Sequence, residues 1–290
     1  MAFKAAKCSA VCSSTVIITG SHSFFKETHC LMQPMVNLAL RAARNAGQDL
    51  VRRLDRFDSY QSTDQEKAKF IADCTIGLEK GIIFELKKSY PEHNFQGRET
   101  GFNQGDAKQP TWQICVIDDI ANFRVGIPSI AITLCCLNGG KAEHAVVVNP
   151  MNGDEFTASK GRGSQLNNRR IRCSQLHSLS DAIVGYTQPM SFNESAFEQR
   201  QRIQSLMSQG QELRNIGSNA LSLAYTAADR FQAALLADVD EYSLQAGGLI
   251  AREAGCLLAD IQGKPSLSSP ANLIVSNPKL LRSLVSGSAE

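Results

Sequence analysis

Residues 144–172, HAVVVNPMNGDEFTASKGRGSQLNNRRIR, decide how the chain folds. The valine-rich run at 142–150 is typical of a buried strand. Residues 154–174 predict a second strand, a turn at the glycines and a third strand. Just before them, residues 129–137 predict another strand, which joins the run at 142–150 through an Asn-Gly-Gly hairpin signal at 138–140. Consecutive strands joined by short turns predict an antiparallel sheet.

Helical patterns flank these strands. Apolar residues recur at helical spacing over 35–57, and a second helix is predicted over 64–89, where the following Tyr90-Pro91 disfavours continuation. After about residue 176 the predicted strands and helices alternate. We therefore expect a mixed α/β fold with two subdomains, an α+β unit at 32–176 and an α/β unit at 177–290, which share one extended sandwich.

Composition and charge narrow the function. The chain has 290 residues, 43% of them hydrophobic, and a formal net charge of +2. A net charge this close to zero argues against general electrostatic binding to nucleic acid. No apolar run reaches the length that a membrane helix needs. The nine cysteines are an odd number without framework spacing, which indicates reduced thiols and a cytoplasmic location.

The first 31 residues fit poorly with the rest of the chain. Lys4 and Lys7 could begin a signal peptide, but the stretch behind them is only weakly apolar and offers no clear cleavage site. Met32 opens the first amphipathic pattern. We expect residues 1–31 to be a disordered or non-native extension rather than a secretion signal.

Five segments, in order along the chain, resemble the inositol monophosphatase family, in particular its bacterial SuhB-like branch. The segments are MQPMVNLALRAARNAG (32–47), LKKSYPEH (86–93), the stretch at 144–172, GSNALSLAYTAADR (217–230) and AGGLIAREAGCLLADIQG (246–263). The resemblance implies the layered αβαβα sandwich of the sugar phosphatases. It also implies hydrolysis of a phosphate monoester by two magnesium ions, which need carboxylate ligands from three motifs.

The first motif is altered by a charge reversal. The segment GRETG at 97–101 stands where relatives carry a glutamate pair, so that Arg98 takes the place of one ligand and Glu99 remains. Two like unit charges about 4 Å apart repel by about 4 kcal/mol at an effective dielectric constant of about 20. Arg98 therefore opposes a metal ion and supplies no ligand.

The second motif is shortened. The segment VIDDIANF at 116–123 stands where relatives have Asp-Pro-x-Asp-Gly-Thr-Thr-Asn-Phe, which requires a deletion of three residues. Asp118 matches the first aspartate and Asp119 falls on the proline, while the second aspartate has no counterpart. In relatives the lost backbone also presents amides at a helix start to the phosphate, so we expect the phosphate cradle to be lost with the ligand.

The third motif and its surroundings change too. In VDEYSLQAGG at 239–248, Tyr242-Ser243 replaces the Trp-Asp pair of relatives, with Asp240 close by. Two further acidic positions of relatives fall on Lys69 and Thr75, and a substrate-contacting glutamate falls on Leu236. The framework positions persist while the site positions change, which is typical of a pseudoenzyme.

The resemblance implies two possible roles. SuhB-like relatives also serve in transcription antitermination with the Nus factors, where they contact NusA and RNA polymerase. Our leading hypothesis is a SuhB-like homodimer without phosphatase activity, catalytic residues or a cofactor, which acts through such protein contacts. Its vestigial site comprises five residues: Arg98, Glu99, Asp118, Asp119 and Ser243.

The alternative is a Mg²⁺-dependent phosphatase acting on inositol-1-phosphate, with a site rebuilt from Glu99, Asp118, Asp119 and Asp240. A third possibility is RNA binding through the basic segment Arg169-Arg170-Ile171-Arg172, which the balanced charge does not favour.

Three further residues are candidates for contacts in the site. For Ser218, Tyr225 and Arg230, helix capping and packing are the preferred explanations.

Overall fold

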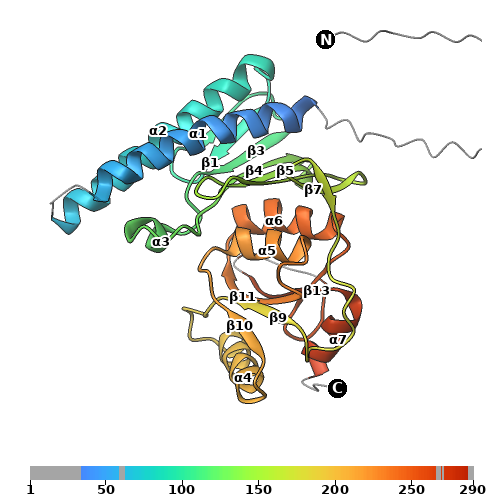
Figure 1. Ribbon diagram of the computed structural model, residues 1–290. Helices are drawn as coiled ribbons and strands as arrows, with labels where there is room; N and C mark the ends of the chain where they lie inside the picture. The colour runs from blue at the N-terminus through green and yellow to red at the C-terminus, as the bar shows by residue number, and fades with distance from the viewer. Residues whose placement is uncertain (1–33, 59–62, 266–268, 270, 287–290) are drawn as a thin grey trace, which may run out of the picture. The chain divides into compact units, whose positions relative to one another are not determined.

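The computed structural model describes residues 34–58, 63–265, 269 and 271–286, and its elements are drawn in Figure 1. The predicted extension at 1–31 lies outside the described residues. The helices are α1 (Pro34–Asp58), α2 (Asp64–Ser89), α3 (Ile120–Arg124), α4 (Glu194–Ser208), α5 (Asn219–Ala227), α6 (Glu241–Glu253) and α7 (Pro278–Ser286). Both long helices predicted near the start of the family segment are present, with bounds close to the expected ones.

The first sheet has eight strands in the order β2-β1-β3-β4-β5-β6-β7-β8. Their bounds are β1 (Asn94–Gly97), β2 (Gly101–Asn103), β3 (Thr111–Cys115), β4 (Ile132–Asn138), β5 (Lys141–Asn149), β6 (Asp154–Ser159), β7 (Gly163–Leu166) and β8 (Arg169–Ile171). All neighbours pair antiparallel except β1 and β3. The hairpins predicted from the stretch 144–172 therefore form the middle and one edge of this sheet.

The second sheet has five strands in the order β10-β9-β11-β13-β12. Their bounds are β9 (Ile183–Tyr186), β10 (Glu212–Arg214), β11 (Ala233–Val239), β12 (Leu257–Asp260) and β13 (Ala271–Ser276). The first sheet ends in the chain at Ile171 and the second begins at Ile183. A subdomain boundary at residue 176 remains a prediction.

Helices and sheets alternate in five layers, as Figure 1 shows. Helices α1 and α2 cover one face of the first sheet, and α5 and α6 lie between the two sheets. Helices α4 and α7 cover the outer face of the second sheet, where their apolar residues join the strands in a third buried cluster. The αβαβα sandwich and the mixed α/β class predicted from the sequence are confirmed.

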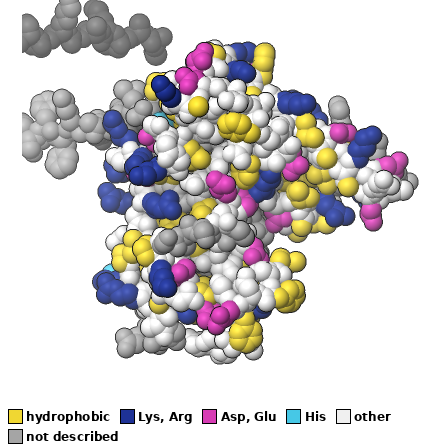
Figure 2. All heavy atoms as spheres, turned by 180° about the vertical axis from the view of Figure 1, so that it is seen from behind, with side chains coloured by type: hydrophobic (Ala, Val, Ile, Leu, Met, Phe, Trp, Pro, Cys, Tyr) yellow, Lys and Arg dark blue, Asp and Glu magenta, His cyan; other side chains and the backbone are white. Residues whose placement is uncertain are grey.

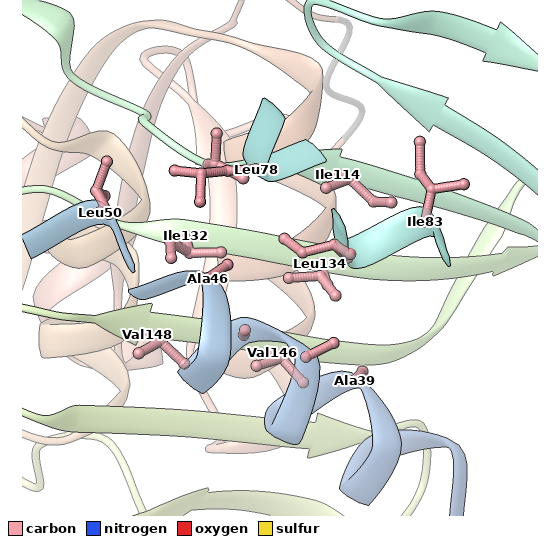
Figure 3. Close-up of a cluster of buried hydrophobic side chains, with 14 of the residues drawn as sticks. Ala39, Ala46, Leu50, Leu78, Ile83, Ile114, Ile132, Leu134, Val146 and Val148 are labelled. Atoms are coloured by element: carbon pink, nitrogen blue, oxygen red, sulfur yellow. The ribbon is translucent and has the colours of Figure 1, made fainter. Parts of the chain in front are cut away.

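The core beneath α1 explains why that helix is amphipathic. Figure 3 shows Ala39, Ala46 and Leu50 of α1 facing side chains of the sheet such as Ile132 and Val148. Small side chains on the helix allow it to approach the branched residues of β4 and β5 closely, which favours dense packing. Leu50 is fully buried in this layer.

One turn differs from the sequence prediction. The region expected to hold a single strand after the glycine turn contains β7 and β8, separated at Asn167 and Asn168. Both asparagines have positive φ, 49° and 64°, which is the conformation that tight two-residue hairpins require and that asparagine tolerates. The pair was a turn signal that the strand assignment passed over.

None of the helices in the described part of the chain is both long enough and apolar enough to cross a membrane.

Candidate functional site

The centre of the candidate site is Asp118, which follows β3. Its carboxylate accepts a hydrogen bond from the backbone N of Ala131 at 2.6 Å, and the Ser218 hydroxyl donates to its other oxygen. Ser218 also caps α5, because its Oγ accepts from the backbone N of Leu221 at 3.0 Å. Burial raises the pKa of the Asp118 carboxyl to about 6, although both hydrogen bonds oppose that shift. The capping role predicted for Ser218 is confirmed, and a contact with Asp118 accompanies it.

Arg98 lies beside this carboxylate and brings a positive charge into the candidate site, called the cleft below and defined by Arg98, Asp118, Asp240 and Ser243. Its Nη2 forms an ion pair with Asp240 Oδ2 at 2.5 Å, and its side chain is only 21% exposed. Its guanidinium stacks over the Tyr242 ring, 5.1 Å from the ring centroid, and interacts electrostatically with Asp118. The arginine is therefore held in the cleft by its neighbours and does not swing out into solvent.

Asp240 and Ser243 meet at the start of α6. Asp240 caps this helix by accepting a hydrogen bond from the backbone N of Ser243 at 2.9 Å, and the Ser243 hydroxyl donates to its second oxygen at 3.2 Å. Because Arg98 contacts the same carboxylate, both oxygens of Asp240 have protein partners. The sequence placed Ser243 at a lost ligand position, and the structure places it beside Asp240.

Asp119 serves the short helix α3. Its Oδ1 accepts a hydrogen bond from the backbone N of Asn122 at 2.9 Å, and Asn122 in turn donates to the carbonyls of Ser129 and Ile216, both at 2.8 Å. A Cβ on Gly217 would come within 2.3 Å of Asp119 Oδ2, so this close approach requires glycine. A helix start survives after the deletion, but its first turn is capped by the chain's own carboxylate.

Glu99 lines a separate pocket, apart from Arg98 and Asp240. This pocket of about 370 Å³ lies between α2 and α3 and is also lined by Ile71, Thr75, Ile120 and Arg124. Thr75 donates its hydroxyl to the Ile71 carbonyl at 2.8 Å, as an ordinary buried helical threonine does. Glu99 is thus next to the Arg98 cluster in sequence, but its side chain belongs to the flank of the cleft.

One buried carboxylate, Glu79 of α2, was missed by sequence reasoning. It accepts hydrogen bonds from the backbone N of Glu99 at 3.1 Å and of Thr100 at 2.9 Å, and from the Thr100 hydroxyl at 2.9 Å. Burial raises its pKa, although these donors favour the charged form. Glu79 holds the turn that presents Arg98. Its place one turn after Thr75, on the buried side of α2, was the available signal.

Two further altered positions, Leu236 and Lys69, carry no acidic group. Leu236 is fully buried in β11, and Lys69 is exposed on α2. Leu236 therefore contributes to the core between the sheets and offers no polar group to the cleft.

The described residues do not fit two magnesium ions. Asp118, Asp119 and Asp240 each accept hydrogen bonds or an ion pair from the protein itself, and an arginine stands among them. Across residues 34–58, 63–265, 269 and 271–286, no group of three or more His, Cys, Asp or Glu side chains is placed to hold a metal. Magnesium prefers several oxygen ligands in near-octahedral geometry, which this arrangement does not offer.

The fold and the match to a family model identify the class of protein. The model of the inositol monophosphatase family matches residues 31–290, and the chain belongs to that family. A native crystal structure of the extragenic suppressor protein SuhB from Bartonella henselae superposes with a TM-score of 0.76 at 27% identity, and the match covers 88% of this chain and 98% of that one.

Two relatives similar in sequence are Nus factors. The Nus factor SuhB of Pseudomonas aeruginosa is 35% identical over 258 residues, which cover 88% of this chain and 95% of the relative. The Nus factor SuhB of Escherichia coli is 30% identical over 254 residues, with the same coverage. The predicted resemblance to the SuhB-like branch is confirmed.

Proposed function

We propose that this chain is a SuhB-like protein without phosphatase activity that acts by protein–protein contact in transcription antitermination. The observation that carries the proposal is the ion pair between Arg98 and Asp240, at 2.5 Å, in the cleft where relatives collect metal ligands. A guanidinium cannot be deprotonated at ordinary pH, so this positive charge is permanent.

The arginine supports the proposal through charge balance. Magnesium sites in such enzymes gather several carboxylates, whose mutual repulsion the metal relieves. Here Arg98 supplies a fixed positive charge near Asp118 and Asp240 and thereby relieves part of that repulsion without a metal. The carboxylate of Asp240 is therefore already paired within the protein, and its ion pair with Arg98 would have to break before a cation could take its place.

The proposed partners are NusA and RNA polymerase, and the proposed state is a cytoplasmic homodimer. Sequence similarity to Nus factors supports this role, since two such relatives match over almost their full length. The surface supports protein contact over direct nucleic-acid binding: Figure 2 shows both positive and negative side chains over much of one face. We propose no membrane partner.

A phosphatase assay tests the lack of activity. We expect no Mg²⁺-dependent phosphate release from inositol-1-phosphate, and no saturable heat when magnesium or manganese is titrated into the protein. The counter-hypothesis is a phosphatase that uses Glu99, Asp118, Asp119 and Asp240 with Mg²⁺. Turnover in the ordinary range of roughly 1–1,000 s⁻¹ that disappears on chelation would establish that alternative and overturn our proposal.

A reversion experiment tests the role of Arg98 directly. The double variant Arg98→Glu, Ser243→Asp restores two acidic side chains around Asp240, and we expect it to gain measurable manganese binding by calorimetry. Arg214→Glu makes the same arginine-to-glutamate charge reversal on the exposed strand β10 and is the control for that part of the change. If the double variant binds no more manganese than the control, Arg98 is not what excludes the metal.

A binding assay tests the protein-contact role. We expect the purified protein to retain NusA or RNA polymerase in a pull-down at micromolar concentration, and the Arg98→Glu, Ser243→Asp variant to retain it equally well. Failure to retain either partner would remove the antitermination proposal while leaving the phosphatase result to stand on its own.

A further inference from the structure

A second cavity lies far from the cleft in the fold, on the outer side of the second sheet between α4 and α7. Its volume is about 600 Å³, within the range of roughly 300–1,000 Å³ typical of small-molecule pockets. Its apolar wall is formed by five side chains: Leu179, Leu206, Ile261, Leu284 and Val285. Four of these are less than 7% exposed, so the wall is part of the core and is in place before any ligand arrives.

The same cavity is lined by Arg202 of α4, and one nitrogen of its guanidinium has no hydrogen-bond partner among the described residues. Its Nη1 is buried and makes no hydrogen bond, and within the described part of the chain no carboxylate lies within ion-pair distance of it. Glu198, one helical turn earlier, lines the same cavity and accepts a hydrogen bond from Gln262 at 2.7 Å. A half-buried guanidinium without an anion is unfavourable, because burial removes water that nothing replaces.

The electrostatics of Arg202 agree with this geometry. Burial lowers the pKa of its guanidinium, with the charge of Glu198 opposing the shift. Arginine nonetheless stays charged at ordinary pH. An anion delivered into the cavity would therefore gain a charge-assisted hydrogen bond from Nη1, which has no hydrogen-bond partner in the described part of the chain, while the charge of Glu198 opposes it.

We propose that this cavity is a binding site for a medium-chain monocarboxylate, with its carboxylate at Arg202 and its alkyl chain along the apolar wall. The apolar wall offers contacts to an alkyl chain, and the unsatisfied Nη1 of Arg202 offers a charged donor to one carboxylate. Guanidinium matches carboxylate in a bidentate geometry that an alcohol cannot reproduce. The proposal concerns a site separate from the cleft and does not depend on the proposed function.

Calorimetric titration of the full chain with three probes of equal length tests the charge requirement. We expect octanoate to bind saturably and raise Tm, and octan-1-ol and octylamine to bind at least tenfold more weakly. Because these are comparisons on the unaltered protein, they hold even if a variant fails to fold. Equal binding of octanoate and octanol, or no saturable binding of octanoate at millimolar concentration, would overturn the proposal.

Variants then assign the site. Arg202→Gln should weaken octanoate binding about 10- to 100-fold, the loss expected for a hydrogen bond to a charged group, and should leave octanol unchanged. The matched control is Arg282→Gln, which removes the same charge from the exposed side of α7. Ser205→Trp fills the cavity from α4 and should abolish binding of both probes. Unchanged octanoate affinity in a folded Arg202→Gln variant would refute the assignment.

Discussion

Two enclosed carboxylates, Asp118 and Asp154, show how differently this chain treats its cleft and its framework. Asp154 accepts hydrogen bonds from both Nη atoms of Arg230 and from Asn152 Nδ2. Burial alone would raise the pKa of Asp154, but the Arg230 hydrogen bonds and charge bring it below its usual value. At Asp118, burial prevails and raises the pKa to about 6.

The opposite pKa shifts of Asp154 and Asp118 indicate that the two carboxylates contribute differently to stability. The framework pairs its buried charge fully, so Asp154 in its ionised form stabilises the native state. In the cleft, the raised pKa of Asp118 means that its ionised form is less favourable in the folded protein than in the unfolded chain. The comparison can be tested by substitutions in both regions.

The largest effect is expected at the framework pair. Arg230→Gln should destabilise the protein by about 2–3 kcal/mol, at the low end for a broken buried pair because the Arg230 side chain is 40% exposed. Urea unfolding monitored by circular dichroism measures this loss in the free energy of unfolding. The control is Arg214→Gln in the exposed pair with Glu212, expected to cost about 0–1 kcal/mol. Equal losses at the two sites would remove the distinction between them.

The next substitution, Asp118→Asn, is expected to raise the stability of the protein at neutral pH. A raised pKa means that protonated Asp118 stabilises the fold fully below the ordinary value of 3.8, and that this contribution is lost as pH rises through about 6. Asp118→Asn cannot ionise, so it should be more stable than the parent by about 2–3 kcal/mol at neutral pH, from 1.36 kcal/mol per pKa unit.

The advantage of Asp118→Asn should shrink towards zero near pH 4. Unfolding free energies across this pH range provide the measurement. A variant that is less stable than the parent at neutral pH would show that ionised Asp118 supports the fold after all.

Arg98→Gln should have a smaller effect, a loss of about 1–2 kcal/mol at neutral pH, because it removes the partner of Asp240. It also removes the positive charge near Asp118, so the titration midpoint of that carboxyl should move further upward. The pH dependence of unfolding reports both. A midpoint that stays in place would mean that Arg98 does not act on Asp118.

The smallest losses of stability are expected at two buried serines, Ser164 and Ser243. Ser164 donates its hydroxyl to the Ile250 carbonyl at 2.6 Å and links β7 to α6, so Ser164→Ala should cost about 1 kcal/mol. In the cleft, Ser243→Ala leaves Asp240 with Arg98 and a backbone donor, so the cost should stay below about 0.5 kcal/mol. Thermal unfolding of the two variants gives the ranking, and the reverse order would contradict it.

The sequence predicted the architecture because periodicity is a local signal. The amphipathic pattern of α1 and the valine run of β5 determine the face that each element buries. The order of the five layers was implied by the family resemblance. The turn at Asn167 and Asn168 was missed because two asparagines within a polar strand are equally compatible with an exposed edge.

The candidate site was predictable only as a set of positions. The family resemblance placed Arg98 and Ser243 at altered ligand positions and Asp118 at a retained one. It could not show that Arg98 pairs with Asp240, which lies in another layer of the fold. The contact of Ser218 with Asp118 spans 100 positions and depends on how α5 meets the end of β3. Such long-range contacts are set by tertiary packing, for which local patterns carry no information.

The layer formed by α5 and α6 determines how the protein is expected to unfold. Alanines and leucines of these helices, such as Ala220, Leu223 and Leu249, contact apolar residues from both sheets within one cluster. Either sheet, produced alone with its own helices, would expose a broad apolar surface to water and would tend to aggregate. The protein should therefore melt in a single cooperative step, and slow amide exchange should extend through both sheets together.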